Sequence, residues 1–222
     1  MNGDSHDGSI HDFLVERYRR FRTESFPARQ DLFEELAQGQ NPRVLFITCS
    51  DSRVVPSLIL AGDPGDVFEC QIVGNIVPAY GDSFGGVSAT LEYAVTVLKV
   101  QAIIVCGHSD CGAMKVLRDP SGFKDLTAIA LWLRHSDAAT RIAREACAGL
   151  SEDEALRLLT RENVIAQIDN MRTHPAVAAG RRRGLEVFGW MYDIKTGAVE
   201  AYDEKTRTFV PLAGRTLDTP KP

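Results

Sequence analysis

Two short segments of the 222-residue chain hold residue types that bind metal ions. CSDSR at 49–53 begins with Cys49, and GHSDCG at 107–112 contains His108 and Cys111. Two thiolates and one imidazole form a soft ligand set that suits zinc. Three protein ligands leave one position of a tetrahedral zinc site open, which is typical of catalytic zinc. If the two segments meet in the fold, we predict that these three side chains hold one zinc ion per chain.

Asp51 and Arg53 are the second chemical feature of the first segment. They lie two residues apart, so both can lie on the same side of an extended loop and form a bidentate salt bridge. Beside zinc, an ionised Asp51 can accept the proton of a zinc-bound hydroxide, and Arg53 keeps that carboxylate charged and aimed. We predict that the two residues form a catalytic dyad. A structural Asp–Arg pair, or a structural zinc clip with Asp51 as the fourth ligand, remains an alternative.

Other interpretations of the same residues fit less well. Gly107 and Gly112 have the spacing of a phosphate-binding loop, but Ala113 follows where that motif requires lysine. The cysteine and arginine of CSDSR are too close together to wrap backbone amides around an anion, as phosphatase loops do. The remaining thiols lie in apolar strands or a predicted helix, and we expect them in the core: Cys70, Cys106 and Cys147.

Composition narrows the class of protein. The chain is 44% hydrophobic and 25% charged, with a formal net charge of −5. It lacks a basic tail, which argues against nucleic acid as a partner. No stretch approaches the roughly 20 apolar residues of a membrane span, and the polar, acidic start is unlike a targeting peptide. An odd number of cysteines in a chain too large to need disulfides indicates a reducing compartment, so we expect a cytoplasmic protein without membrane contact.

Hydrophobic periodicity predicts strands that alternate with helices. Apolar runs at 43–48, 66–73 and 101–106 are typical of buried strands, and 86–99 has helical spacing. Further helices are predicted at 11–39, interrupted by Pro27, and at 112–118, 125–133, 137–149, 152–172 and 176–183. Strands at 184–194 and 198–203 are predicted to form a hairpin. This alternation predicts an α/β fold with a mostly parallel central sheet flanked by helices.

The predicted sheet explains how the two metal-binding segments can meet. Functional sites in open parallel sheets form beyond the carboxyl ends of the strands. CSDSR directly follows the strand at 43–48, and GHSDCG directly follows the strand at 101–106. If these two strands are neighbours, the ligands gather at one edge of the sheet.

Taken together, these motifs resemble those of the β-class carbonic anhydrases. CSDSRV at 49–54 and GHSDCGAM at 107–114 are similar to the family's zinc-binding motifs, and family-like segments extend over roughly residues 13–213. The resemblance implies reversible hydration of carbon dioxide to bicarbonate and a proton, by attack of zinc-bound hydroxide. It also implies a single domain over 1–222, with an N-terminal helical arm at about 11–39 and a zinc-binding α/β core at about 43–213.

The resemblance further implies an assembly and a substrate pocket. Family members form homodimers or larger assemblies, such as tetramers or octamers, with the active site at the dimer interface, and we expect the N-terminal helices to pack on a partner subunit. Gln40 matches a glutamine that hydrogen-bonds substrate, and the backbone amide of Gly112 is a second candidate donor. The apolar pocket for carbon dioxide is matched by Phe68, Val73 and Tyr93, some of them from the neighbouring subunit.

Two departures from the family pattern affect details of this prediction. Gln71 and Ile72 stand where the family usually has Arg and Asn, so a charged contact there is not expected. Phe46 stands where bicarbonate-regulated members have Trp, so we expect no regulatory bicarbonate site. Two alternative functions remain: hydrolysis of carbon disulfide or carbonyl sulfide at the same site, or an inactive zinc-stabilised binding module. A module would need none of Gln40, Asp51 and Arg53, which argues against it.

Overall fold

The structure is a computed structural model that describes residues 8–123 and 125–212. The chain divides into two compact units after Gln40, and each is described by itself. Residue 213, the predicted end of the core, lies outside the described residues, as do the ends of the predicted domain at 1–7 and 214–222. The grouping of both units into one domain stays a prediction.

The first unit is the predicted helical arm. It contains α1 (Ile10–Arg20) and α2 (Gln30–Leu36), joined by two short helical turns at Phe21–Ser25 and Pro27–Arg29. A capping box starts α1, because the Ser9 side chain and the third helical residue satisfy each other's backbone N–H groups. Three phenylalanine rings pack together at the bend, with centroids 5.1–6.3 Å apart: Phe21, Phe26 and Phe33. No residue of these helices is buried within the unit.

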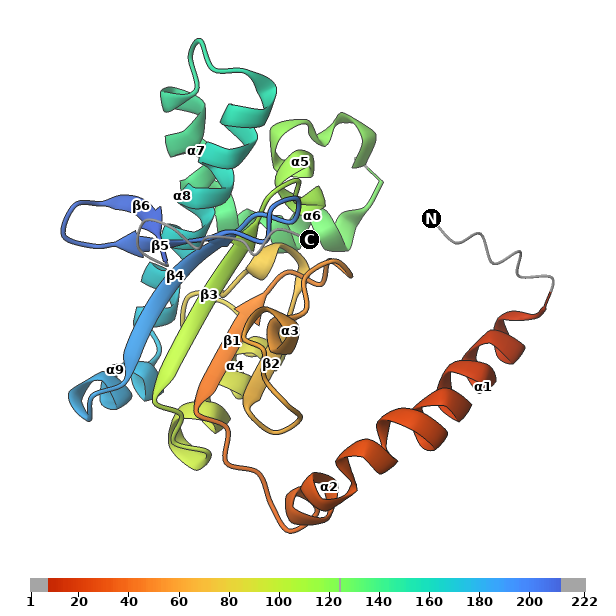
Figure 1. The fold of residues 1–222 in the computed structure, drawn as a ribbon. Helices are drawn as coiled ribbons and strands as arrows, with labels where there is room; N and C mark the ends of the chain where they lie inside the picture. Colours follow the sequence, from red (N-terminus) through yellow and green to blue (C-terminus); the bar gives the residue numbers. More distant parts are fainter. Residues whose placement is uncertain (1–7, 124, 213–222) are drawn as a thin grey trace. The chain divides into compact units, whose positions relative to one another are not determined.

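The second unit is built around a six-stranded sheet in the order β2-β1-β3-β4-β5-β6 (Figure 1). The first four strands run parallel and the last two antiparallel, so the predicted mostly parallel sheet is confirmed. The sequence did not predict the last strand. The strands are β1 (Val44–Thr48), β2 (Val67–Gln71), β3 (Ala102–His108), β4 (Glu186–Tyr192), β5 (Val199–Asp203) and β6 (Thr208–Pro211).

Helices flank this sheet, as predicted. The longest, α8 (Glu152–Arg172), begins at a capping box on Ser151 and matches its predicted span. None of the described helices has the length and hydropathy needed to cross a bilayer. The short α3 was not predicted. The other helices are α3 (Pro56–Ile59), α4 (Gly86–Glu92) with its continuation Tyr93–Val97, α5 (Gly112–Arg118), α6 (Thr127–Leu133), α7 (Asp137–Ala146) and α9 (Pro175–Arg182).

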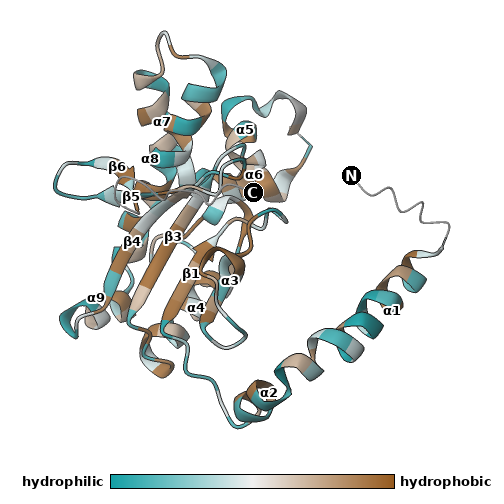
Figure 2. Cartoon of the chain, in the orientation of Figure 1, coloured by the Kyte–Doolittle hydropathy of each residue, from teal (hydrophilic) through white to brown (hydrophobic). Residues whose placement is uncertain are grey.

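Strand alternation divides the core between the two faces of the sheet. On one face, Leu45 and Ile47 pack with Ile103 and with apolar residues of α4, α8 and α9. On the other face, Phe46 packs edge-on against Trp190, with ring centroids 5.9 Å apart. Both faces are apolar, and the central strands therefore appear as nearly continuous hydrophobic runs in Figure 2.

The pairing of β1 with β3 answers the question of whether the two motif-bearing strands are neighbours. They are adjacent and parallel, with Thr48 opposite Cys106. The residues that follow them in the chain therefore emerge at the same edge of the sheet. The predicted strand at 101–106 runs two residues further, so that His108 belongs to β3 rather than to a loop.

Glycines allow α8 to lie close against β3 and β4. A Cβ at Gly189 would lie 2.7 Å from Cδ1 of Ile168 and 3.0 Å from Cγ1 of Val164. Overpacking of this kind costs about 1–3 kcal/mol, so Gly189→Ala should lower the free energy of unfolding by that amount in urea titrations. Gly86→Ala is the control, because a Cβ there meets nothing within 4 Å. Equal stability of the two variants would contradict this packing.

Candidate metal centre

Cys49, His108 and Cys111 come together at the carboxyl edge of the sheet. Cys49 is the first residue after β1, His108 is the last residue of β3, and Cys111 directly precedes α5. Their ligand atoms all lie within 4.8 Å of one another, and all three residues are buried. Asp110 adopts a left-handed conformation, with φ of 58°, and this turn brings Cys111 back beside His108. The three predicted zinc ligands thus form one cluster.

The hydrogen bonds of His108 fix which ring nitrogen is available to a metal. Its Nδ1 lies 2.9 Å from the carbonyl oxygen of Ser109, which can only accept, so Nδ1 carries the proton. Nε2 is buried and has no hydrogen-bond partner. Ser109 is itself held, because its N–H donates to the carbonyl of Tyr192 and its Oγ accepts from the N–H of Ile194. An orphaned, oriented imidazole nitrogen is what a zinc ligand requires.

The two thiols of the cluster are electrostatically coupled. A hydrogen bond from Cys111 lowers the pKa of Cys49 to about 4, against the opposing effect of burial. The Gly74 N–H, 3.3 Å from the Cys49 sulfur, lowers it further. The pKa of Cys111 is raised, because it donates to Cys49 and is buried beside that charge. The cluster therefore holds one thiolate readily, and a cation between the sulfurs would release the second proton. This donor set fits zinc.

Asp51 and Arg53 form the bidentate pair that the spacing predicts. Arg53 Nε donates to Asp51 Oδ1 at 2.9 Å, and Arg53 Nη2 donates to Asp51 Oδ2 at 2.8 Å. These hydrogen bonds hold the pKa of Asp51 well below its usual range. Oδ2 lies 3.9 Å from His108 Nε2, so the carboxylate borders the cluster. Because Arg53 engages both oxygens, the arrangement favours a dyad over Asp51 as a fourth ligand.

Sequence reasoning missed a second anchor of Arg53. Arg53 also donates to Oδ2 of Asp110 at 3.0 Å, and Lys115 forms an ion pair with the other oxygen of Asp110. Asp110 is part of GHSDCG, so the sequence placed it near the site but gave no sign that it would contact Arg53. The guanidinium is thus held between two carboxylates.

The predicted substrate residues do not all adjoin the cluster of one chain. Val73 packs against the core group that contains Cys49. Gly112 is the first residue of α5, and a Cβ added there would meet no atom within 4 Å. Phe68 and Tyr93 lie together, with ring centroids 5.9 Å apart. Phe68 pairs with Leu45 in the first half of β1, and packs against a different core group. Gln40 is exposed at the end of the first unit.

The other thiols differ in burial. Cys106 is fully buried, and burial raises its pKa to about 12. Cys70 is half-buried and packs against the core. Cys147 follows the last residue of α7 and is only partly buried, so its assignment to the core was wrong.

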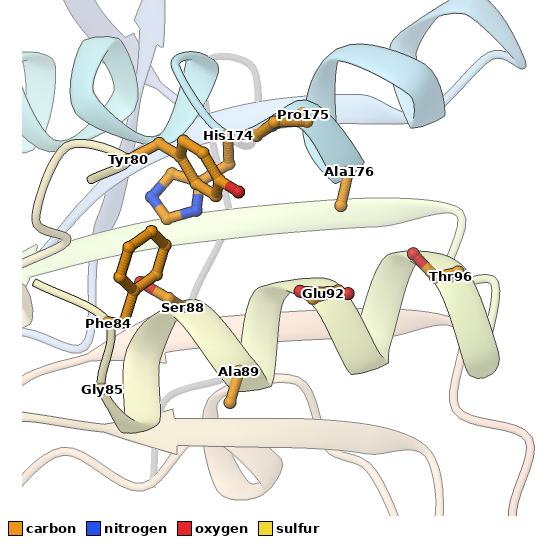
Figure 3. A pocket seen from close by; sticks show the side chains of 10 residues that line it. All are labelled: Tyr80, Phe84, Gly85, Ser88, Ala89, Glu92, Thr96, His174, Pro175 and Ala176. Carbon is orange, nitrogen blue, oxygen red and sulfur yellow. The ribbon is translucent and has the colours of Figure 1, made fainter.

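A pocket of about 580 Å³ lies elsewhere, between α4 and the start of α9 (Figure 3). It is lined by Tyr80, Phe84, Glu92 and His174 among others, and by none of the predicted site residues. This pocket is therefore distinct from the cluster of predicted metal ligands, and cavity volume alone does not locate the candidate metal centre.

Comparison with known proteins identifies the family. The family described as carbonic anhydrase matches residues 44–199. A Pseudomonas aeruginosa protein named carbonic anhydrase is 49% identical over 201 residues, which cover 90% of this chain and 91% of that protein. The solved structure of the β-carbonic anhydrase CcaA superimposes with a TM-score of 0.89 and 41% identity, covering 94% of each chain. The chain belongs to the β-class carbonic anhydrases.

A further solved structure agrees. It comes from a study of two tetrameric β-carbonic anhydrases of Sordaria macrospora, and matches with a TM-score of 0.78 and 30% identity over 86% of this chain and 95% of that one. β-Carbonic anhydrases are zinc lyases, so this protein is an enzyme whose cofactor is zinc and whose general reaction is hydration of carbon dioxide.

Replacing one predicted ligand tests the cluster. Cys49→Ser should weaken zinc binding by more than about 100-fold, because even the partners that hydrogen-bond ligands contribute 10–100-fold to metal affinity. Competition with a chelator measures this. Cys147→Ser removes a thiol outside the cluster and should bind zinc like the wild type. If both variants retain zinc equally, Cys49 is not a ligand.

Proposed function

We propose that this protein catalyses reversible hydration of carbon dioxide, with zinc held by Cys49, His108 and Cys111. One observation carries the proposal. A buried imidazole nitrogen without a partner lies beside two thiols and within 3.9 Å of a carboxylate that Arg53 keeps charged. A binding module that only needs zinc for stability has no use for this oriented carboxylate.

Zinc, when bound, supplies a Lewis acid that lowers the pKa of a water molecule toward neutrality. Asp51 then acts as a hydrogen-bond acceptor at its Oδ2, the oxygen nearer His108. Because its pKa is depressed, the carboxylate stays ionised across the neutral range and orients the reacting water by accepting its hydrogen. Arg53 keeps the carboxylate pointing at this water rather than letting it rotate onto the metal.

The remaining roles concern the substrate. Carbon dioxide is neutral and apolar, so its pocket must exclude water more than bind strongly. Val73 supplies an apolar wall beside Cys49 in the same chain. The Gly112 amide, at the start of α5, donates to a bicarbonate oxygen. Phe68 and Tyr93, paired away from the cluster of their own chain, complete the pocket of a second subunit together with Gln40.

We also propose that the protein is a cytoplasmic homo-oligomer, formed from dimers in which the N-terminal helices pack on the partner. The related Sordaria macrospora enzymes are described as tetrameric. In the arm, Ile10, Leu14 and Tyr18 recur along α1 at helical spacing and are 73%, 57% and 63% exposed within the unit. An exposed apolar stripe of this kind marks a protein interface.

No regulatory bicarbonate site is proposed at Phe46. Its side chain is fully buried against Trp190 and offers no polar group. Gln71, the other departure from the family pattern, donates to the carbonyl oxygen of Val54 at 2.9 Å. Phe46 thus belongs to the apolar core on one face of the sheet, and Gln71 connects β2 to the loop after β1.

Replacing Asp51 tests the mechanism. Asp51→Asn should retain zinc but lose about 10²–10⁴-fold in hydration rate near neutral pH, because an amide no longer presents a charged acceptor that orients the reacting water. Stopped-flow hydration with a pH indicator measures the rate, and metal analysis is the control.

The wild-type rate should rise from neutral to alkaline pH. Since the lowered pKa keeps Asp51 ionised throughout that range, the rise reports the reacting water. Full activity of Asp51→Asn would refute the dyad.

Charge on the apolar stripe of α1 tests the assembly. Leu14→Glu combined with Tyr18→Glu should shift the protein to a smaller assembly, because a desolvated carboxylate cannot remain at an apolar interface. Light scattering coupled to size-exclusion chromatography measures the mass. Glu16→Gln, on the polar side of the same helix, should leave the mass unchanged. An unchanged mass in the double variant would show that this stripe is not an interface.

A further inference from the structure

The loop between β2 and α4 takes its hydrogen bonds from α8. Asn163 Nδ2 donates to the carbonyl oxygen of Gly74 at 3.0 Å. Gln167 Oε1 accepts from the N–H of Val77 at 2.9 Å, and Asn170 Nδ2 donates to the carbonyl of the same residue at 3.0 Å. These amide side chains recur at i, i+4 and i+7, so one stripe of the helix replaces the strand partners that the loop lacks.

The same stripe continues past the end of α8. His174 Nε2 lies 2.9 Å from the carbonyl oxygen of Pro78, and Thr173 Oγ1 accepts from the N–H of Tyr80. Figure 3 shows the ring of His174 beside that of Tyr80, where their centroids are 5.5 Å apart. The loop is therefore held along its length, from Gly74 to Tyr80.

Asn163 can present its amide in only one orientation. Its Oδ1 accepts from Ser136 Oγ at 2.7 Å and from Gln167 Nε2 at 2.9 Å. All three residues have no exposed surface. A flipped amide would set Nδ2 against the Gln167 Nε2 donor and Oδ1 against the Gly74 carbonyl oxygen, so the network directs Nδ2 to Gly74.

Gly74 joins this network to the metal cluster. It lies in the left-handed region, with φ of 70°, and a Cβ there would approach Cβ of Ala113 to 3.2 Å. Its carbonyl oxygen accepts from Asn163, and its N–H donates to the sulfur of Cys49 at 3.3 Å. The position of this N–H therefore depends on a residue of α8 whose own hydrogen bonds go to Ser136, Gly74, Asn75 and Gln167.

We propose that Asn163, oriented by Gln167, is a positioning residue for the zinc centre, because it holds the Gly74 amide against the Cys49 thiolate. This inference rests on Cys49 being a zinc ligand, as proposed above. A hydrogen bond to a coordinating thiolate withdraws charge from the sulfur, so the sulfur donates less charge to the metal. In a site with two thiolates, that withdrawal keeps zinc a stronger Lewis acid.

Cobalt substitution tests the proposal without relying on activity. Asn163→Ala should shift the thiolate-to-cobalt charge-transfer band of the Co²⁺-loaded enzyme to longer wavelength, because a thiolate that loses a hydrogen bond is oxidised more easily. Zinc, measured by chelator competition, should bind about 10–100-fold more weakly, because the loss of ligand orientation at Cys49 outweighs the stronger charge donation of its sulfur. Asn170→Ala is the control: it removes the side-chain amide bond to Val77 of the same loop and a 3.3 Å bond to Gln167 Oε1, but leaves the bond of Asn163 to Gly74. It should retain both the band and the affinity.

The outcomes separate this inference from the proposed function. If Cys49→Ser binds zinc like the wild type, the proposed ligand set fails, and this inference with it. If Cys49→Ser loses zinc but Asn163→Ala keeps the wild-type band and affinity, or shifts no more than Asn170→Ala, only the positioning role fails. Asn163→Ser, which leaves room for a bridging water, takes the same measurements if Asn163→Ala does not fold. Unfolding of both variants in saturating zinc would overturn the proposal, because Asn163 would then serve the fold as a whole.

Discussion

The parallel pairing of β1 with β3 is the constraint on which the candidate site depends. Thr48 lies opposite Cys106, and both strands run nearly free of polar residues through the core. Parallel strands expose their carboxyl ends at one edge, so Cys49 and His108 meet although they are distant in sequence. A one-residue slip of this register would turn every core side chain of β1 to the wrong face. The burial that fixes the register therefore also fixes the geometry of the cluster.

Around this edge, each reactive group is held by a partner from another part of the chain. Ser109 orients the His108 ring, Arg53 fixes the Asp51 carboxylate, and Gly74 donates to the Cys49 sulfur. Buried polar atoms are costly unless they are hydrogen-bonded, yet His108 Nε2 is left without a partner. An unpartnered buried nitrogen lowers the stability of the fold. This cost is expected where a cation, once bound, supplies the missing interaction to His108 and the two sulfurs. The same logic reaches α8 through Asn163.

Much of this arrangement was predictable from the sequence, because local signals were strong. Apolar runs identified β1 and β3, hydrophobic periodicity identified the span of α8, and the spacing of Asp51 and Arg53 predicted their salt bridge. Long-range contacts left no such signal. β6 is a short edge strand stabilised by pairing with β5, and the contact of Asp110 with Arg53 depends on tertiary proximity. Nor did any local signal show that the amide stripe of α8 is buried, because its hydrogen-bond partners lie in the distant loop from Gly74 to Tyr80.

X-ray absorption at the zinc edge of the purified wild-type protein tests the central claim most directly. The claim is that Cys49, His108 and Cys111 hold one zinc ion and leave one position free of protein. The account predicts one zinc per chain, with two sulfur neighbours at about 2.3 Å and two lighter neighbours at about 2.0–2.1 Å. A protein that purifies without zinc, or a zinc ion with no sulfur neighbours or with four, would contradict it.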